Sequence, residues 1–151
     1  MLATIIAPPR VLLVWNTTAS VPVGLYVVSR ATPRRGDLFV IQLPPEMETL
    51  AVSRALLTPN TPVLKPIAAL SGDRVCRWGA AVTINGRLAA IARRFDRRDR
   101  TLPIWQGCRL LSASQVFVLA LNPESFDSRY YGPLHIQLGR GVAHPLVTLP
   151  Y

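Results

Sequence analysis

Short apolar runs rich in β-branched residues recur along the chain, and proline, glycine or small polar residues separate them. Runs of about four to eight residues bounded by such turn residues are typical of β-strands. Fourteen prolines are spread over the 151 residues, and they disfavour long helices because proline lacks the backbone donor. The pattern predicts a mostly β fold, with strands over residues 11–14, 26–29, 38–41, 81–84, 88–91 and 116–121.

One segment, residues 46–57, departs from the strand pattern. Its apolar residues Met47, Leu50 and Leu57 recur at helical spacing. Two glutamates stand near its start and an arginine near its end, which suits the dipole of a helix. We predict one short helix there.

Domain organisation follows from length and from the first residues. A chain of 151 residues can bury a proper core as a single domain, and we expect this domain to span residues 11–151. Six of the first seven residues are apolar, but seven residues cannot span a bilayer, which takes about twenty. We expect residues 1–10 to be a truncated remnant of a membrane anchor or a disordered stub.

A polar cluster ending at Ser20 lies between two apolar runs. Pro22 fixes its own φ and restricts Val21 before it, so the Ser20 hydroxyl sits on a short, stiff turn between two predicted strands. Such a turn can hold a nucleophile in a fixed position. It is also an ordinary turn, because serine and threonine are common there.

The lysine content is the second chemical signal. Sixteen of the 17 basic residues are arginine, and the only lysine, Lys65, lies in the apolar segment 63–70. Burial lowers the pKa of an amine, whereas arginine stays protonated. A neutral Lys65 could act as general base toward a serine. The other interpretation is a packed stem with a solvated amine.

Three sequence boxes resemble those of a known family. The first reads Ser-Val-Pro-x-Gly-Leu-Tyr from Ser20, the second runs from Lys65 to Leu-Ser-Gly-Asp, and the third reads Ser-x-Asp-Ser-Arg-Tyr-x-Gly from Ser125. In this order they resemble the boxes of type I signal peptidases, serine peptidase family S26. The first box resembles the TraF-type branch, the maturation peptidases of conjugative transfer systems. Ser71 stands where the family has proline.

The resemblance implies the mostly β fold of that family and a serine protease without cofactor. Ser20 would be the nucleophile and Lys65 the base of a Ser-Lys dyad. The oxyanion donors would be the backbone N–H of Ser20 and the hydroxyl of Thr18. Ser125 would orient the lysine amine, and Asp127 and Arg129 would brace the site.

The resemblance also implies a substrate and a location. Type I signal peptidases cut exported preproteins after small residues, so the expected partner is an exported, pilin-like precursor at the periplasmic face of the cytoplasmic membrane. The acyl-enzyme could pass to water, which gives cleavage, or to a substrate amine, which gives a joined or cyclic product.

Charge allows other interpretations. The net charge is +9, and residues 87–100 hold six arginines against two aspartates. Such a run can contact anionic lipid or nucleic acid, or it can be a solvated loop. It lacks interleaved aromatic residues beyond Phe95 and matches no nucleic-acid motif, so we favour a solvated loop for this run. The net charge fits an anionic membrane surface and DNA equally well; we expect the membrane surface as a partner and no nucleic acid. The alternatives to a peptidase are a basic β-rich binding module and an inactive structural relative.

Cysteine and histidine complete the candidate chemistry. Cys76 and Cys108 are the only cysteines, and they are either a disulfide, if the domain lies outside the cytoplasm, or two buried thiols. A metal site would need more ligands at closer spacing, and we expect none. His135 and His144 are expected at the surface, with a histidine base for Ser20 as a distant alternative.

Overall fold

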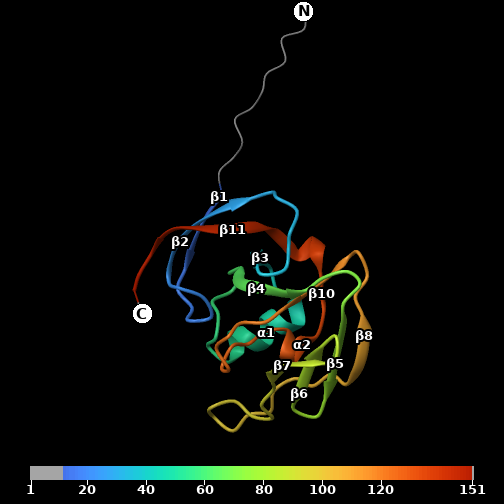
Figure 1. Cartoon of the computed structure of the whole chain (residues 1–151). Coiled ribbons are helices and arrows are strands. Elements are labelled where there is room, and N and C mark those ends of the chain that lie inside the picture. The colour runs from blue at the N-terminus through green and yellow to red at the C-terminus, as the bar shows by residue number, and fades with distance from the viewer. Residues whose placement is uncertain (1–11, 151) are drawn as a thin grey trace, which may run out of the picture.

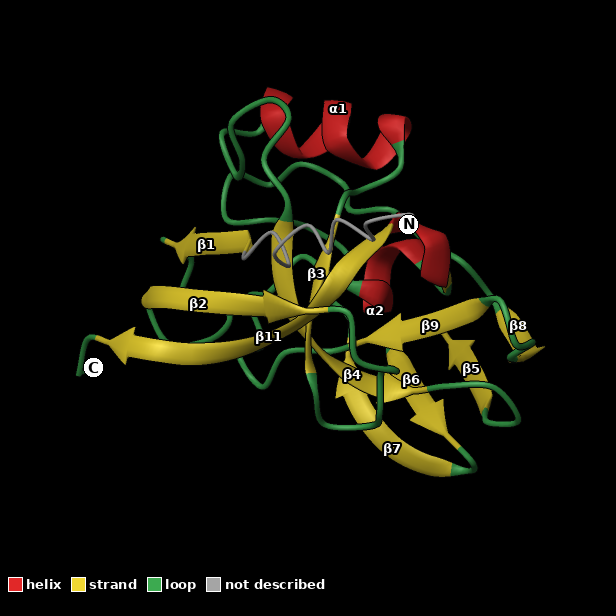
Figure 2. Ribbon diagram, turned by 90° about the horizontal axis from the view of Figure 1, so that it is seen from above, coloured by secondary structure: helices red, strands yellow, loops and turns green. Residues whose placement is uncertain are grey.

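The computed structural model describes residues 12–150. It contains two antiparallel sheets and few helices, which confirms the predicted mostly β fold (Figures 1 and 2). The larger sheet has the strand order β1-β2-β11-β3-β4-β9-β10, and the smaller has β7-β6-β5-β8.

The strands of the larger sheet are β1 (Leu12–Asn16), β2 (Gly24–Ser29), β3 (Leu38–Ile41), β4 (Val63–Ala69), β9 (Gln115–Val118), β10 (Leu134–His135) and β11 (Gly139–Thr148). Those of the smaller sheet are β5 (Arg74–Trp78), β6 (Ala81–Ile84), β7 (Arg87–Ile91) and β8 (Gly107–Leu110). The helices are α1 (Pro45–Ser53), α2 (Ser128–Tyr131) and the 3-10 turn Ile136–Leu138.

The C-terminal strand β11 closes the larger sheet. It pairs with β2 on one side and β3 on the other, so the end of the chain joins segments close to its start (Figure 1). β11 begins at Gly139, where a Cβ atom would collide with the ring of Phe39. Only glycine therefore lets β11 come this close to β3.

The core consists of three clusters of buried apolar side chains. The smallest joins Val21, which follows Ser20, to Leu64, which precedes Lys65, together with Tyr26, Val40 and Ala143. Because both neighbours are buried in one cluster, the turn with Ser20 and the strand with Lys65 are fixed relative to each other.

The predicted helix is present but ends earlier than expected. It covers Pro45–Ser53 rather than residues 46–57. Ala55 has a φ of 57°, and the N–H groups of Ala55 and Leu56 bond back to the carbonyls of Val52 and Ala51. This bonding is a Schellman motif, which terminates a helix and usually places glycine at the left-handed residue.

The last predicted strand is also shorter than expected. β9 ends at Val118 rather than at residue 121. The N–H of Ala120 donates to the Asp127 carboxylate, and its carbonyl accepts from Arg129. These side chains take the backbone bonds that would have continued the strand. Arg129 lies in α2, a short helix that the pattern did not predict, and Asp127 is the N-cap of this helix.

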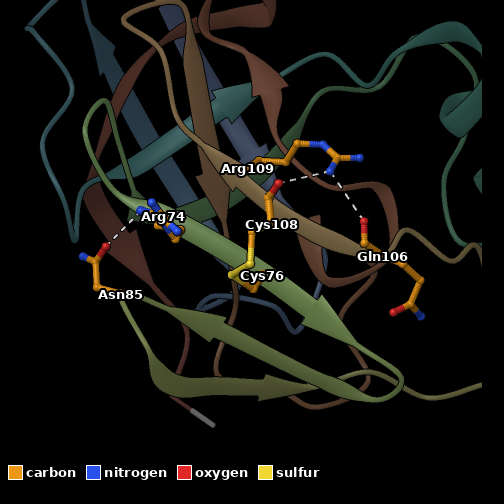
Figure 3. Close-up of a disulfide and its surroundings, with 6 residues drawn as sticks. All are labelled: Arg74, Cys76, Asn85, Gln106, Cys108 and Arg109. Carbon is orange, nitrogen blue, oxygen red and sulfur yellow. Dashed lines mark hydrogen bonds between the residues drawn. A yellow bond between two sulfur atoms is a disulfide. The ribbon is translucent and has the colours of Figure 1, made fainter.

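The smaller sheet contains the predicted Asn-Gly hairpin. β6 pairs with β7 across Asn85 and Gly86, both at positive φ, which confirms the turn. On the next strands Cys76 lies directly opposite Cys108, and a disulfide joins them (Figure 3). It ties β5 to β8 across 32 residues of sequence.

The predicted remnant, residues 1–10, lies outside the described residues, as does Val11 of the first predicted strand. Among the described residues, we find no helix with the length and apolarity needed to cross a membrane.

Candidate active site

Three side chains that are remote in sequence meet at one point. The Nζ atom of Lys65 donates hydrogen bonds to Ser20 Oγ and to Ser125 Oγ, each at 2.6 Å. The two hydroxyl oxygens lie 3.2 Å apart. A hydroxyl nucleophile within hydrogen-bond reach of an amine, with a third group orienting that amine, is an arrangement suited to acyl transfer.

Lys65 is held by the centre of the larger sheet. It lies on β4, which is flanked by β3 and β9, and it pairs with Phe39. Alternation along the strand puts Lys65 on the same face as Val63 and Ile67, which belong to the largest core cluster. The sequence therefore directs this amine inward, and Lys65 is only 4% exposed.

Burial changes the chemistry of that amine. Desolvation lowers the pKa of Lys65 from 10.5 to about 8; the positive charge of Arg129 also lowers it, and the negative charge of Asp127 acts in the opposite direction. Near neutral pH a fraction of the molecules therefore holds a neutral amine beside Ser20, which an exposed lysine would not supply.

Asn16 shapes the turn that carries Ser20. Its Nδ2 donates to the carbonyls of Thr18, Val21 and Pro22, at 2.9 to 3.1 Å. The hydroxyl of Tyr26 also donates to the Pro22 carbonyl, at 2.6 Å. A buried amide thus satisfies backbone carbonyls that the tight turn leaves without strand partners.

Thr18 stands beside Ser20 in this turn, and both side chains line the same cavity. The Thr18 hydroxyl donates to Asn16 Oδ1 at 2.9 Å, and the Thr18 N–H is directed at the same oxygen at 3.2 Å. The hydroxyl hydrogen of Thr18 is therefore already bonded within the turn.

A buried ion pair stabilises the loop that carries Ser125. Arg129 Nε lies 2.7 Å from Asp127 Oδ1, and both side chains are almost completely buried. Arg129 also donates to the carbonyls of Ala120, Asn122 and Pro123. Three carbonyls of one loop thus converge on one guanidinium, which fixes the position from which Ser125 reaches Lys65.

Arg77 links the smaller sheet to this brace. It is 2% exposed, and its guanidinium donates to the carbonyl of Arg129 at 2.6 Å and to that of Pro103 at 3.2 Å. Sequence reasoning missed both Arg77 and Asn16. The only available signal was a polar residue at an inward position of a strand, and that signal is weak without the fold.

Three adjoining cavities surround the site. The central one, about 190 Å³, is lined by Ser20, Lys65, Ser125 and mainly apolar neighbours. A cavity of about 310 Å³ borders it on the side of Trp15, and a groove of about 460 Å³ on the side of Arg93. Leu56, just after α1, lines all three. The three cavities together therefore offer space for an extended peptide on both sides of Ser20.

The remaining candidates lie away from Ser20. His135 is exposed, and His144 is an exposed residue of β11 that contacts Ser29 at 3.3 Å. The Cys76–Cys108 disulfide bridges the smaller sheet. Over residues 12–150 we find no cluster of three or more histidine, cysteine or acidic residues that could hold a metal ion.

The basic run folds into β7 and the loop that follows it. Three of its arginines pair with acidic residues: Arg93 and Arg97 contact Glu124, and Arg100 contacts Asp96. A fourth, Arg94, lies over the ring of Phe95. The run is thus partly a structured loop beside the site and not only a solvated face.

Comparison with known proteins gives a consistent result. A family model described as "Signal peptidase, peptidase S26" matches residues 1–146. A plasmid transfer protein TraF from Escherichia coli is 30% identical over 145 residues, covering 88% of this chain and 81% of the relative. A probable conjugal transfer protein TraF from Sinorhizobium fredii is 31% identical, covering 88% and 76%.

A solved structure is also similar. A signal peptidase I from Enterococcus faecalis V583 matches 76% of this chain and 98% of its own, with 22% identity and a TM-score of 0.43.

Proposed function

The chain belongs to the signal peptidase family, peptidase S26, and we propose that it is a serine endopeptidase in which Ser20 and Lys65 form the catalytic dyad. The observation that carries the proposal is the 2.6 Å contact between the Ser20 hydroxyl and a buried amine whose pKa is about 8. A base with a pKa near the working pH combines a useful neutral fraction with a real driving force for proton transfer.

The first half of the reaction is acylation. Neutral Lys65 accepts the hydroxyl proton while Ser20 Oγ bonds to the carbonyl carbon of the scissile peptide. The resulting Lys65 ammonium then protonates the leaving amine as the C–N bond breaks, which leaves an ester on Ser20. Ser125 is a positioning residue: its 2.6 Å contact holds the amine of Lys65 in place through both transfers.

The tetrahedral intermediate needs donors for its oxyanion. We assign this role to the backbone N–H of Ser20 and the hydroxyl of Thr18. Because the Thr18 hydroxyl donates to Asn16 Oδ1 in the free enzyme, it must rotate away from that acceptor when the oxyanion forms.

The second half of the reaction resolves the ester. Neutral Lys65 deprotonates either a water molecule or an amine of the substrate, and the alkoxide of Ser20 leaves and regains a proton from the lysine. Water gives a cleaved product and an amine gives a new peptide bond, which is cyclic when the amine belongs to the same chain. Both routes use the same dyad.

We infer that the substrate is an exported precursor with small residues at the cleavage site. The central cavity, about 190 Å³ and lined mainly by apolar side chains, lies beside Ser20, where the residues next to the scissile bond would bind. The relatives named plasmid transfer protein TraF support a role in conjugative transfer, with a pilin precursor as the substrate and the periplasmic face of the cytoplasmic membrane as the place of reaction. We infer an anionic membrane surface as a second partner, because the net charge is +9.

The test is processing of a membrane-anchored pilin precursor by wild type, Ser20→Ala and Lys65→Met, with folding checked for each. Ser114→Ala, at an exposed serine whose hydroxyl contacts that of Ser112 at 3.0 Å, is the matched control. Wild type and the control should process the precursor, and the two dyad variants should be inactive while folded. Equal processing by all four folded proteins would exclude the proposed peptidase.

A further inference from the structure

An arginine-rich groove continues directly from the cavity that contains Ser20. Its volume is about 460 Å³, against about 190 Å³ for the central cavity. The two share five lining residues: Ala19, Leu56, Asn122, Glu124 and Phe126. A ligand in the groove is therefore contiguous with whatever lies at the Ser20 hydroxyl.

The charge of this groove is strongly unbalanced. Five arginines line it, against two acidic residues, which gives a net charge of +3. Arg54 and Arg100 both contact Asp96, so this group keeps one positive charge in excess. Arg98 forms no hydrogen bond or ion pair through its side chain anywhere in residues 12–150.

The second group of charges lies next to the catalytic loop. Arg93 and Arg97 both contact Glu124, the residue before Ser125, and their side chains are 48% and 80% exposed. One carboxylate cannot neutralise two guanidiniums, and the fork geometry of arginine leaves N–H donors free for another carboxylate. These donors can reach a ligand from the solvent side.

Part of the groove lining is apolar. Phe95, Leu102, Phe126 and Tyr130 line it together with the arginines. Apolar walls reduce the screening of charges near them, so a bound carboxylate interacts with the arginines more strongly than it would on an open surface. The combination of apolar and basic lining residues fits a polypeptide that carries both acidic and apolar side chains.

We propose that this groove is a specificity subsite that binds an acidic segment of the precursor near its scissile bond. The inference rests on the peptidase activity proposed above and deepens it by naming a substrate feature. An acidic peptide is favoured over an anionic lipid headgroup because the groove opens into the Ser20 cavity, where the substrate chain must lie. Arg93, Arg97 and Arg98 are the specificity residues.

The test uses internally quenched peptides in matched pairs, identical except for three glutamates in one member and three glutamines in the other. The three residues are placed on either side of the scissile bond in turn. Each pair is cleaved by wild type, by the double variant Arg97→Ser/Arg98→Ser, and by the control Arg74→Ser/Arg87→Ser. The control removes two exposed arginines from the smaller sheet, neither of which lines the groove.

On one side of the scissile bond, wild type should cleave the glutamate peptide with a kcat/KM about three- to tenfold higher than the glutamine peptide. Arg97→Ser/Arg98→Ser should lose this preference, the control should keep it, and added salt should reduce it. Equal rates for both peptides on both sides would overturn the inference, as would a preference that survives in the groove variant or disappears equally in the control.

Two further readouts separate the possible failures. Fluorescence anisotropy of the labelled glutamate and glutamine peptides with Ser20→Ala reports binding without cleavage. If wild type cleaves neither peptide, the proposed peptidase is disproved. The anisotropy then still shows whether the groove binds the glutamate peptide more tightly. Cosedimentation with phosphatidylglycerol vesicles tests the lipid alternative. If the groove variant loses only vesicle binding and keeps the glutamate preference, the groove is a membrane contact and the inference fails.

Discussion

Lys65 donates a 2.6 Å hydrogen bond to the hydroxyl of Ser20, although 45 residues of chain separate them. The contact depends on a shared core cluster, since Val21 and Leu64, the chain neighbours of the two residues, are buried together. Packing of ordinary apolar side chains therefore sets the distance between the two reactive groups. The same arrangement buries the amine of Lys65, and burial disfavours its charged form.

Lys65→Met should make the protein more stable at neutral pH. Burial holds the pKa of Lys65 at about 8 in the folded state, against 10.5 for an exposed lysine. The folded state therefore disfavours the ammonium, and removing it should raise the free energy of unfolding by about 1–3 kcal/mol at pH 7. Urea unfolding of both proteins at pH 7 measures this, and a less stable variant would contradict it.

The same pKa predicts how wild-type stability changes with pH. Between pH 8 and 10.5 the unfolded chain binds a proton at Lys65 and the folded protein does not. Wild-type stability relative to Lys65→Met should therefore rise across this window, by roughly 3 kcal/mol in total, and be constant below it. Parallel pH curves for the two proteins would show that the amine is not desolvated.

Removing one member of the buried ion pair should be far more damaging than removing a surface charge. Asp127→Ala leaves Arg129 buried without its carboxylate, and we expect a loss of about 3–5 kcal/mol. Arg35→Ala is the control, since this side chain is 59% exposed in its pair with Asp73, and it should cost less than about 1 kcal/mol. Similar losses for the two variants, measured by chemical denaturation, would contradict the bracing role of Asp127.

Asn16→Ala should lower the rate through the position of Ser20. The change removes the donor to three turn carbonyls, and a nucleophile displaced by about 1 Å can lose roughly a hundredfold in rate. Thr17→Ala, at an exposed residue of the same turn, should be nearly neutral. The rate of Asn16→Ala should still depend on pH as in wild type, because Lys65 is untouched; a shifted profile would mean that Asn16 acts on the base.

Ala55→Gly should stabilise the end of α1. Ala55 has a φ of 57°, the left-handed conformation that glycine adopts without the strain caused by Cβ. We expect a gain of about 0.5–1 kcal/mol, seen as a higher midpoint in thermal unfolding. Ala51→Gly, in the helix itself and fully buried, is the opposing control and should destabilise the protein.

Local sequence signals identified much of this molecule. The strand runs and the Asn-Gly hairpin were visible because they depend on neighbouring residues. Lys65 stood out because one lysine among 16 arginines, in an apolar run, is chemically unusual. The family boxes added Ser125, Asp127 and Arg129, whose side chains converge on one loop.

The error in the last strand and the failure to identify Asn16 and Arg77 share a physical cause. The strand predicted to residue 121 ends at Val118 because side chains of Asp127 and Arg129 take the backbone bonds of Ala120. The partners of Asn16 and Arg77 are likewise backbone carbonyls: those of Asn16 lie in its own turn, and Arg77 reaches Pro103 and Arg129, 26 and 52 residues away. Such bonds exist only after the chain has folded, so periodicity and composition do not reveal them.

The most direct test of the Ser20–Lys65 dyad is the pH dependence of kcat/KM for a peptide without titratable groups, because this parameter reports the pKa of the free enzyme. From pH 6 upward kcat/KM should rise about tenfold per unit and level off above the pKa of Lys65, about 8. The control is circular dichroism at each pH, which checks folding. A profile that is flat from pH 6 to 10 in folded protein would contradict Lys65 as the general base.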